Sequence, residues 1–163
     1  MIVISDTSCL SGLFRIGELQ ILEKIFHEII IPQKVYDELM VLRKFGYDIS
    51  EIQNAIWLKI ENPSNSSLLQ DLLKNLDEGE AYAIALTVEI KADLLIIDEI
   101  KGRLAAQKLN LNITGVAGIL LRAKAIGIIF EVKPLLDNMI QNAGFRMGQK
   151  LYSDILKAAK EYI

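Results

Sequence analysis

Short apolar runs alternate with helix-forming segments along most of this sequence. The apolar runs predict strands at 1–5, 28–32, 56–61, 93–98 and 111–116. The segments between them carry apolar residues at helical spacing, and they predict helices at 8–26, with a break near Gly17, and at 33–45, 77–91 and 99–110. Strands that alternate with helices pair in parallel and are covered on both faces. The pattern therefore predicts an α/β fold with three layers, α/β/α, around a five-stranded parallel sheet.

The chain length and the distribution of turn residues indicate a single domain. With 163 residues, of which 52% are hydrophobic, the chain can bury a substantial core. The only linker-like stretch, 61–67, is too short to separate two domains. From about 118 onward the pattern is helical, with breaks at Gly127 and Gly144. We therefore expect one domain over 1–163 that ends in a helical tail.

Four acidic residues occupy positions that such a sheet can bring together. Asp6 ends the first predicted strand and Asp98 ends the fourth, while Glu38 and Glu80 lie on the helices that follow the second strand and precede the fourth. Open parallel sheets bind ligands beyond the carboxyl ends of their strands, where the strand order reverses. Carboxylates that close together cannot all stay ionised without a cation. The pattern predicts a Mg²⁺ or Mn²⁺ site, because these ions prefer oxygen ligands and the chain has only one His and one Cys.

The charge of the chain bears on its partners. A formal net charge of −3 argues against a surface coated with positive charge for nucleic acid. One bound divalent ion would change this sum to −1 and two would change it to +1. Lys101 and Arg103 follow the fourth strand, so they are candidate phosphate ligands beside the metal. Arg146, Lys150 and Tyr152 in the tail are either RNA contacts or ordinary surface residues.

Four motifs carry a resemblance to a known family. The segments "VISDTSCLSGL", "IIIPQKVYDEL", "LDEGEAYAIAL" and "LLIIDE", in this order, resemble the PIN domain family, and in particular a PIN-like prokaryotic subfamily. This resemblance implies a metal-dependent endoribonuclease with the sheet order 3-2-1-4-5. It implies that Asp6, Glu38, Glu80 and Asp98 are the catalytic, metal-binding acids. It also places the hydroxyl of Thr7 or Ser8 beside them, to orient water or phosphate.

The resemblance also implies partners and a location. Similarity to the toxin components of prokaryotic toxin–antitoxin pairs leads us to expect RNA as substrate, a cognate antitoxin that covers the site, and a homodimer. No apolar stretch approaches the roughly 18 residues needed to cross a bilayer. We therefore expect a cytoplasmic protein without membrane association.

The sequence departs from the family pattern at one position, and this leaves alternatives open. Many PIN domains carry another acid two or three residues after the fourth-strand aspartate, where this chain has Ile100 and Lys101. Glu99 is the candidate substitute, as a further metal ligand. One alternative is a PIN-like interaction module without activity. Another is a phosphatase of the haloacid-dehalogenase type, but that chemistry needs a second aspartate where Ser8 stands.

Glu80 has a competing structural interpretation. Asp77 and Glu80 form a D-x-x-E pattern before an apolar run, which is the signature of a capping box at a helix start. A Glu80 side chain that folds back onto the cap would be less available to a metal. We favour the metal role as a hypothesis, because Glu80 matches the position of the family's acid.

Overall fold

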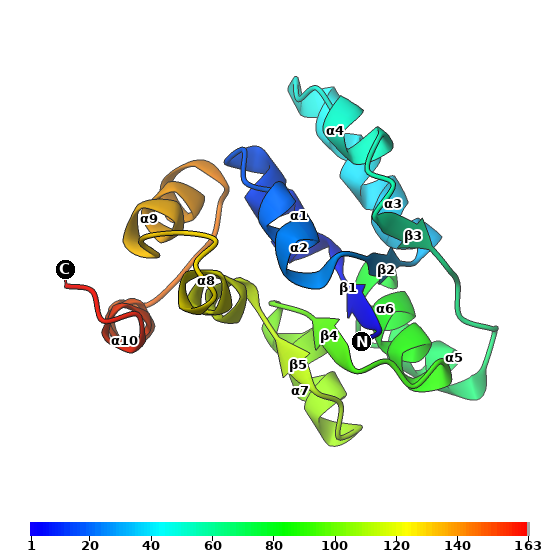
Figure 1. The fold of residues 1–163 in the computed structure, drawn as a ribbon. Coiled ribbons are helices and arrows are strands. Elements are labelled where there is room, and N and C mark those ends of the chain that lie inside the picture. Colours follow the sequence, from blue (N-terminus) through cyan, green and yellow to red (C-terminus); the bar gives the residue numbers. More distant parts are fainter. Residues whose placement is uncertain (163) are drawn as a thin grey trace.

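Five short parallel strands form the centre of the structure, a computed structural model that describes residues 1–162 (Figure 1). They are β1 (Val3–Ser5), β2 (Ile29–Ile31), β3 (Leu58–Ile60), β4 (Leu94–Ile96) and β5 (Ile113–Thr114). The strand order is β3-β2-β1-β4-β5, and every neighbouring pair is parallel. This topology confirms the expected fold class and sheet order.

The strand order reverses beside β1. The chain passes from β1 through β2 to β3 on one side, and then returns to place β4 and β5 on the other side. In the β1–β4 pair Ile4 lies opposite Leu95, and the Asp6 backbone N–H donates to the Ile96 carbonyl at 3.0 Å, one residue beyond β1. The carboxyl ends of β1 and β4 therefore lie side by side, which is where an open parallel sheet binds its ligands.

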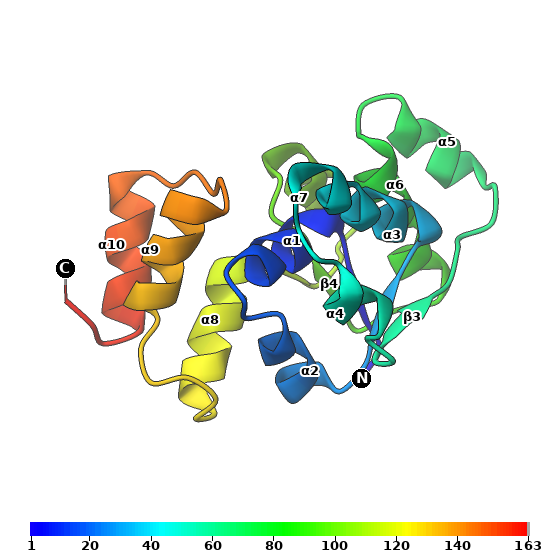
Figure 2. The same ribbon diagram turned by 90° about the horizontal axis from the view of Figure 1, so that it is seen from above.

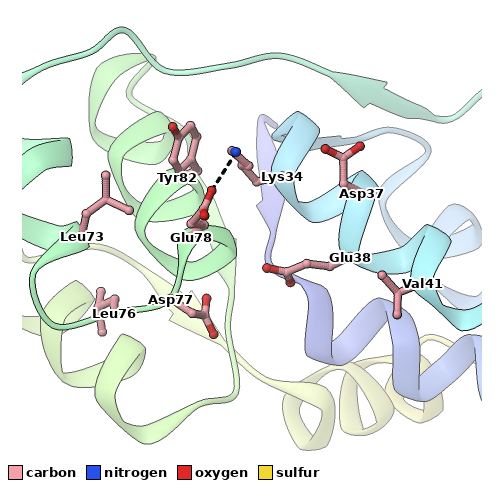
Figure 3. A pocket seen from close by; sticks show the side chains of 9 residues that line it. All are labelled: Lys34, Asp37, Glu38, Val41, Leu73, Leu76, Asp77, Glu78 and Tyr82. Carbon is pink, nitrogen blue, oxygen red and sulfur yellow. Dashed lines mark ion pairs between the residues drawn. The ribbon is translucent and has the colours of Figure 1, made fainter.

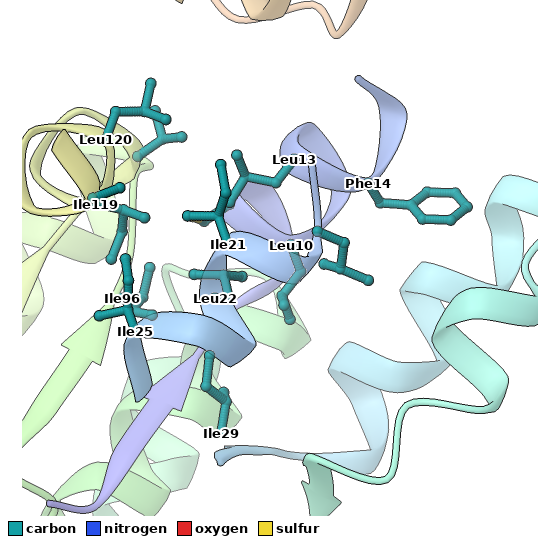
Figure 4. Close-up of a cluster of buried hydrophobic side chains, with 14 of the residues drawn as sticks. Leu10, Leu13, Phe14, Ile21, Leu22, Ile25, Ile29, Ile96, Ile119 and Leu120 are labelled. Carbon is teal, nitrogen blue, oxygen red and sulfur yellow. The ribbon is translucent and has the colours of Figure 1, made fainter. Parts of the chain in front are cut away.

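Two apolar layers cover the sheet, because successive strand residues face opposite sides. On one face α1 (Thr7–Arg15), α2 (Gln20–Phe26) and α8 (Val116–Ala125) pack onto strand residues that include Ile29 and Ile96 (Figure 4). On the other face α6 (Glu78–Glu89) and α7 (Ile100–Lys108) cover Ile4 and Leu95. Both layers are fully buried, so β1 and β4 cannot shift in register without exposing apolar side chains.

The remaining helices differ in part from the sequence expectation. They are α3 (Gln33–Met40), the 3₁₀ helix η1 (Val41–Phe45), α4 (Ser50–Gln53), α5 (Ser67–Leu73), α9 (Lys133–Asn142) and α10 (Gln149–Ala158). The predicted helix 33–45 therefore tightens to 3₁₀ geometry in its last third, and α8 starts at Val116 inside the predicted fifth strand. The helices α4 and α5 were not predicted. The sequence does contain a signal for the start of α5, because serine is a preferred N-cap residue. In the structure Ser66 accepts a hydrogen bond from the Leu69 backbone N–H at 3.1 Å.

The C-terminal helices α9 and α10 stand beside α1 and α8, on the side of the molecule away from α5 (Figure 2). A guanidinium N–H of Arg15, in the last turn of α1, donates to the Ala143 carbonyl at 3.1 Å. Glu161 accepts hydrogen bonds from the backbone N–H groups of Val132 and Lys133 at the start of α9, at 2.7 and 2.8 Å. Among residues 1–162, no helix combines the length and apolar character that crossing a bilayer requires.

A glycine in α1 permits this docking. A methyl group at Gly12 would lie 2.5 Å from the Met139 methyl carbon and would overlap the Phe145 ring. Glycine inside a helix costs about 1 kcal/mol relative to alanine. The close approach of Phe145 and Met139 therefore explains why residue 12 is a glycine, whereas the stability of α1 alone would favour alanine.

We expect Gly12→Ala to lower the free energy of unfolding by about 1 to 2 kcal/mol, because overpacking outweighs the gain in helix propensity. Urea denaturation measures this change. Ser11→Ala, at the preceding position of the same helix, should change the free energy by less than about 0.5 kcal/mol. A Gly12→Ala protein more stable than wild type would contradict the close packing of Phe145 on α1.

Candidate active site

Two buried carboxylates lie at the adjacent ends of β1 and β4. Asp6 follows β1 and is the N-cap residue of α1, and its side chain is only 1% exposed. Asp98 follows β4 by two residues and is partly buried. Asp6 Oδ1 and Asp98 Oδ2 are both buried, and neither has a hydrogen-bond partner among residues 1–162. Buried oxygens without a partner are rare in folded proteins and indicate a missing water, ion or ligand.

The environment of Asp6 disfavours its charge. Burial is the main cause that raises the pKa of Asp6 well above its usual value, and the carboxylates of Asp98 and Glu80 raise this pKa further. The Ser8 backbone N–H offsets the shift only in part. Among residues 1–162, no cationic side chain offsets the charge of Asp6, so a proton or a bound cation must do so.

Asp98 is held in place by the start of α8. Its Oδ1 accepts a hydrogen bond from the Val116 backbone N–H at 3.0 Å. A methyl group at Gly115 would overlap this same oxygen and would lie 3.0 Å from Arg103 Nη1. Burial raises the pKa of Asp98, while the Val116 N–H and the Arg103 guanidinium lower it in part. Since Oδ1 is occupied, Oδ2 is the oxygen left for a ligand.

Glu80 both caps α6 and faces the acidic cluster. The capping box is complete, with the Glu80 N–H donating to Asp77 Oδ1 at 2.9 Å and the Asp77 N–H donating to Glu80 Oε2 at 3.4 Å. The other oxygen, Oε1, lies 3.2 Å from where a methyl group at Gly102 would be. Burial, followed by the nearby Asp77 carboxylate, raises the pKa of Glu80 to about 7. The capping interpretation is confirmed, and it uses only one of the two Glu80 oxygens.

The side chain of Glu38, a residue of α3, lies against the start of α6. Thr7 donates its hydroxyl hydrogen to Glu38 Oε2, and the Glu38 oxygens would lie 2.7 and 2.8 Å from a methyl group at Gly79. Figure 3 shows Glu38 extending from α3 toward Asp77, in a pocket also lined by Lys34 and Glu78. Burial raises the pKa of Glu38, and the Thr7 hydroxyl lowers it in part. Thr7, the residue after Asp6, thus connects Glu38 to the end of β1.

Asp98 opens onto a second and larger pocket, a groove of about 960 Å³ that we call the α1–α7 groove. Its lining includes Thr7, Ser8, Asp98, Glu99, Arg103 and Arg146. Ser8 donates its hydroxyl hydrogen to Glu99 Oε1 at 3.4 Å, and Arg103 Nη1 donates to the Ile97 carbonyl at 2.8 Å. Lys101 is exposed on α7 and does not line the groove. Arg103 is therefore better placed than Lys101 to meet a phosphate beside Asp98.

The acids are gathered, but they are not arranged as a closed set of ligands. Asp98 and Glu80 both act on the charge of Asp6, and Glu38 is joined to this group through Thr7. Among residues 1–162, no group of three or more His, Cys, Asp or Glu side chains has an arrangement that could hold a metal ion. The free oxygens of Asp6 and Asp98 nevertheless fit a hard divalent cation, because they are buried, close to neighbouring carboxylates and without partners.

Sequence reasoning missed the residues that make room for these acids. Gly79, Gly102 and Gly115 each leave space against one carboxylate, that of Glu38, Glu80 and Asp98 respectively. Asp77 was assigned only to the capping box, yet its charge raises the pKa of Asp6, Glu38 and Glu80. The glycines were visible in the sequence, but which carboxylate each one faces depends on contacts between distant segments.

The structure defines a class of α/β proteins with acidic side chains at the reversal of strand order, and comparison with known proteins identifies the family within this class. A family model described as PIN domain matches residues 2–161. The chain belongs to the PIN domain family, whose members are generally nucleases.

A solved structure agrees on the fold. A PilT N-terminus domain protein from the hyperthermophilic archaeon Sulfolobus solfataricus P2 is similar with a TM-score of 0.55 and 19% sequence identity. The similarity covers 76% of this chain and 93% of that protein. No curated protein matches the sequence. At this level of identity the likeness supports the shared fold, while the site rests on the residues described above.

We expect Asp6→Asn to raise the free energy of unfolding of the metal-free protein at pH 7 by about 1 to 3 kcal/mol. The substitution keeps the shape of the side chain and removes the free-energy cost at pH 7 of either burying the Asp6 charge among repelling carboxylates or protonating the carboxyl. Chemical denaturation in the presence of a chelator measures the difference. A loss of stability would instead make Asp6 a structural hydrogen-bond acceptor.

The raised pKa of Glu80 predicts a pH dependence of stability. Its folded-state pKa of about 7 exceeds the usual 4.5, so the folded protein keeps a proton that the unfolded chain releases. The stability of the metal-free protein should therefore fall as the pH rises from about 4.5 to 7, by about 2 kcal/mol after allowance for solvent screening. Glu80→Gln keeps the cap acceptor and should flatten this part of the profile. Parallel profiles for the two proteins would exclude Glu80 as the titrating group.

Proposed function

We propose that this protein is a metal-dependent endoribonuclease that hydrolyses phosphodiester bonds at the ends of β1 and β4. Its membership of the PIN domain family supports a nuclease. The observation that carries the proposal is the pair of buried, partnerless oxygens, Asp6 Oδ1 and Asp98 Oδ2, at adjacent strand ends. A fold that buries two such carboxylates gains stability by binding a cation there, even though the Arg103 guanidinium offsets part of the charge of Asp98.

Each acid has a role that follows from its contacts. Asp6 and Asp98 would hold a Mg²⁺ or Mn²⁺ ion, which when bound supplies an activated water and stabilises charge on the phosphate. Glu80 and Glu38 would contribute through ordered water, because both carboxylates are already anchored, by Asp77 and by Thr7. In the metal-free protein the pKa of Glu80 is about 7, so Glu80 can hold a proton at neutral pH until a bound cation favours its charged form.

The groove next to Asp98 supplies the place for a substrate. Arg103 keeps one N–H group on the Ile97 carbonyl, and its remaining guanidinium donors are available to a phosphate. The Ser8 hydroxyl and Glu99 lie at the same groove and can orient water. An anionic strand therefore meets a cationic side chain beside the carboxylates, where its charge would otherwise be repelled.

The biological setting is a further part of the proposal. The resemblance of the four sequence motifs to toxin components of toxin–antitoxin pairs supports a toxin that acts on RNA in the cytoplasm. A cognate antitoxin would then cover the groove, and the toxin would form a homodimer. A small neighbouring gene that encodes a DNA-binding protein would support this assignment.

One observation favours a second candidate, a PIN-like interaction module without activity. Within the part of the chain that the structure describes, no third acid joins Asp6 and Asp98 in a metal-binding arrangement. The phosphatase alternative has no such support, because Ser8 occupies the position of its second aspartate. Metal binding and cleavage, measured together, separate the nuclease from the inactive module.

We expect millimolar Mg²⁺ or Mn²⁺ to raise the melting temperature by several degrees and to permit cleavage of single-stranded RNA under single-turnover conditions. Asp98→Asn should abolish the thermal shift and lower the cleavage rate at least about 100-fold, because it removes a ligand charge. Asp71→Asn, on the exposed face of α5, is the control and should change neither quantity. A melting temperature that does not respond to metal would exclude the proposed site.

A further inference from the structure

The segment between α9 and α10, residues 143–148, forms part of the α1–α7 groove. All six of its residues line the groove, together with Asp98 and Arg103. Three contacts fix the segment in place: Arg15 donates to the Ala143 carbonyl at 3.1 Å, the Phe145 N–H donates to the Met139 carbonyl at 3.2 Å, and the Phe145 ring lies over Gly12. The segment 143–148, together with the helices α9 and α10 that it joins, therefore forms part of the wall of the groove at Asp98.

Arg146 is the free cation of this wall. It is exposed, and within residues 1–162 its side chain makes neither a hydrogen bond nor an ion pair. Three lysines of the same C-terminal region, in contrast, are paired with acids: Lys124 with Glu161, Lys133 with Asp137 and Lys150 with Asp154. Arg146 lines the same groove as Asp98 and Glu99 but is not paired with either of them. Its planar set of N–H donors is therefore available to a phosphate.

The rest of the lining distinguishes a single strand from a duplex. Ile100 and Leu151 line the groove although they are 76% and 54% exposed, and the partly buried Met147 lies there too. Exposed apolar side chains beside cations suit unstacked bases that are attached to phosphates. A duplex would present phosphates, sugars and base edges, but not the faces of its bases, because these are stacked on one another.

We propose that residues 143–148 guide a single RNA strand toward Asp98, and that Arg146 is a positioning residue that binds one phosphate of this strand. The inference rests on the proposed ribonuclease function and names the part of the chain that holds the substrate. It gives the C-terminal helices a role in substrate binding, in addition to their packing on α1 and α8.

The test is the affinity for a fluorescently labelled, single-stranded RNA of mixed sequence, measured by anisotropy in the presence of EDTA so that no metal-dependent cleavage occurs. Arg146→Gln should weaken binding about tenfold at low salt. It should also reduce the slope of log affinity against log salt by about 0.7, the value for one lost phosphate contact on a single strand. A merely structural role for Arg146 would leave this slope unchanged.

The control is Lys150→Gln, since Lys150 is exposed, pairs with Asp154 and does not line the groove. It should keep the wild-type affinity and salt slope. An unchanged salt slope in Arg146→Gln, an equal loss in Lys150→Gln, tighter binding of the corresponding duplex, or no RNA binding by wild type would each overturn the proposal.

The metal-induced rise in melting temperature separates this inference from the proposed function. Arg146→Gln should keep the full rise, because it leaves Asp6 and Asp98 intact. If the protein binds RNA through Arg146 but shows no metal response, the groove assignment stands and the nuclease assignment falls. If metal binds and Arg146→Gln has the wild-type RNA affinity, the proposed metal site stands and the proposed role of Arg146 falls.

Discussion

The burial of the Asp6 carboxyl beside β4 is the constraint around which the other acids are arranged. Parallel pairing of β1 with β4 fixes Asp6 next to the segment that carries Asp98, and two apolar layers prevent the strands from sliding. Burial and the neighbouring carboxylates make the charged form of Asp6 costly. The fold therefore concentrates negative charge at one end of its sheet. A proton neutralises this charge at low pH, and a cation can neutralise it at neutral pH.

The acids around Asp6 are held by contacts that leave part of each carboxylate free. Glu80 uses one oxygen in the capping box of α6, Asp98 uses one at the start of α8, and Glu38 is bound by Thr7. Helix starts are suited to this task because their backbone N–H groups have no partners within the helix. The same contacts that begin helices thus orient carboxylates, so capping and metal binding are compatible roles for Glu80.

The C-terminal unit extends the site beyond the sheet. Because Gly12 has no side chain, Phe145 lies directly against α1, and the segment that follows it borders the groove at Asp98. Within residues 1–162 Arg146 has no partner there, whereas Lys124, Lys133 and Lys150 form ion pairs. The groove at Asp98 is thus bordered by two guanidinium groups, those of Arg103 and Arg146, which come from α7 and from the segment between α9 and α10.

The sequence by itself determined the strand and helix alternation, the acids at the strand ends and the capping box at Asp77, because periodicity and caps are local properties. It missed α4 and α5, whose short apolar patterns were hidden beside polar stretches. The family motifs supplied the strand order, which local patterns do not contain. Only the tertiary structure decided that Thr7 binds Glu38, that Gly115 makes room for Asp98 and that Arg146 faces the groove. Each of these contacts joins residues far apart in the chain, and their distances depend on how whole helices pack.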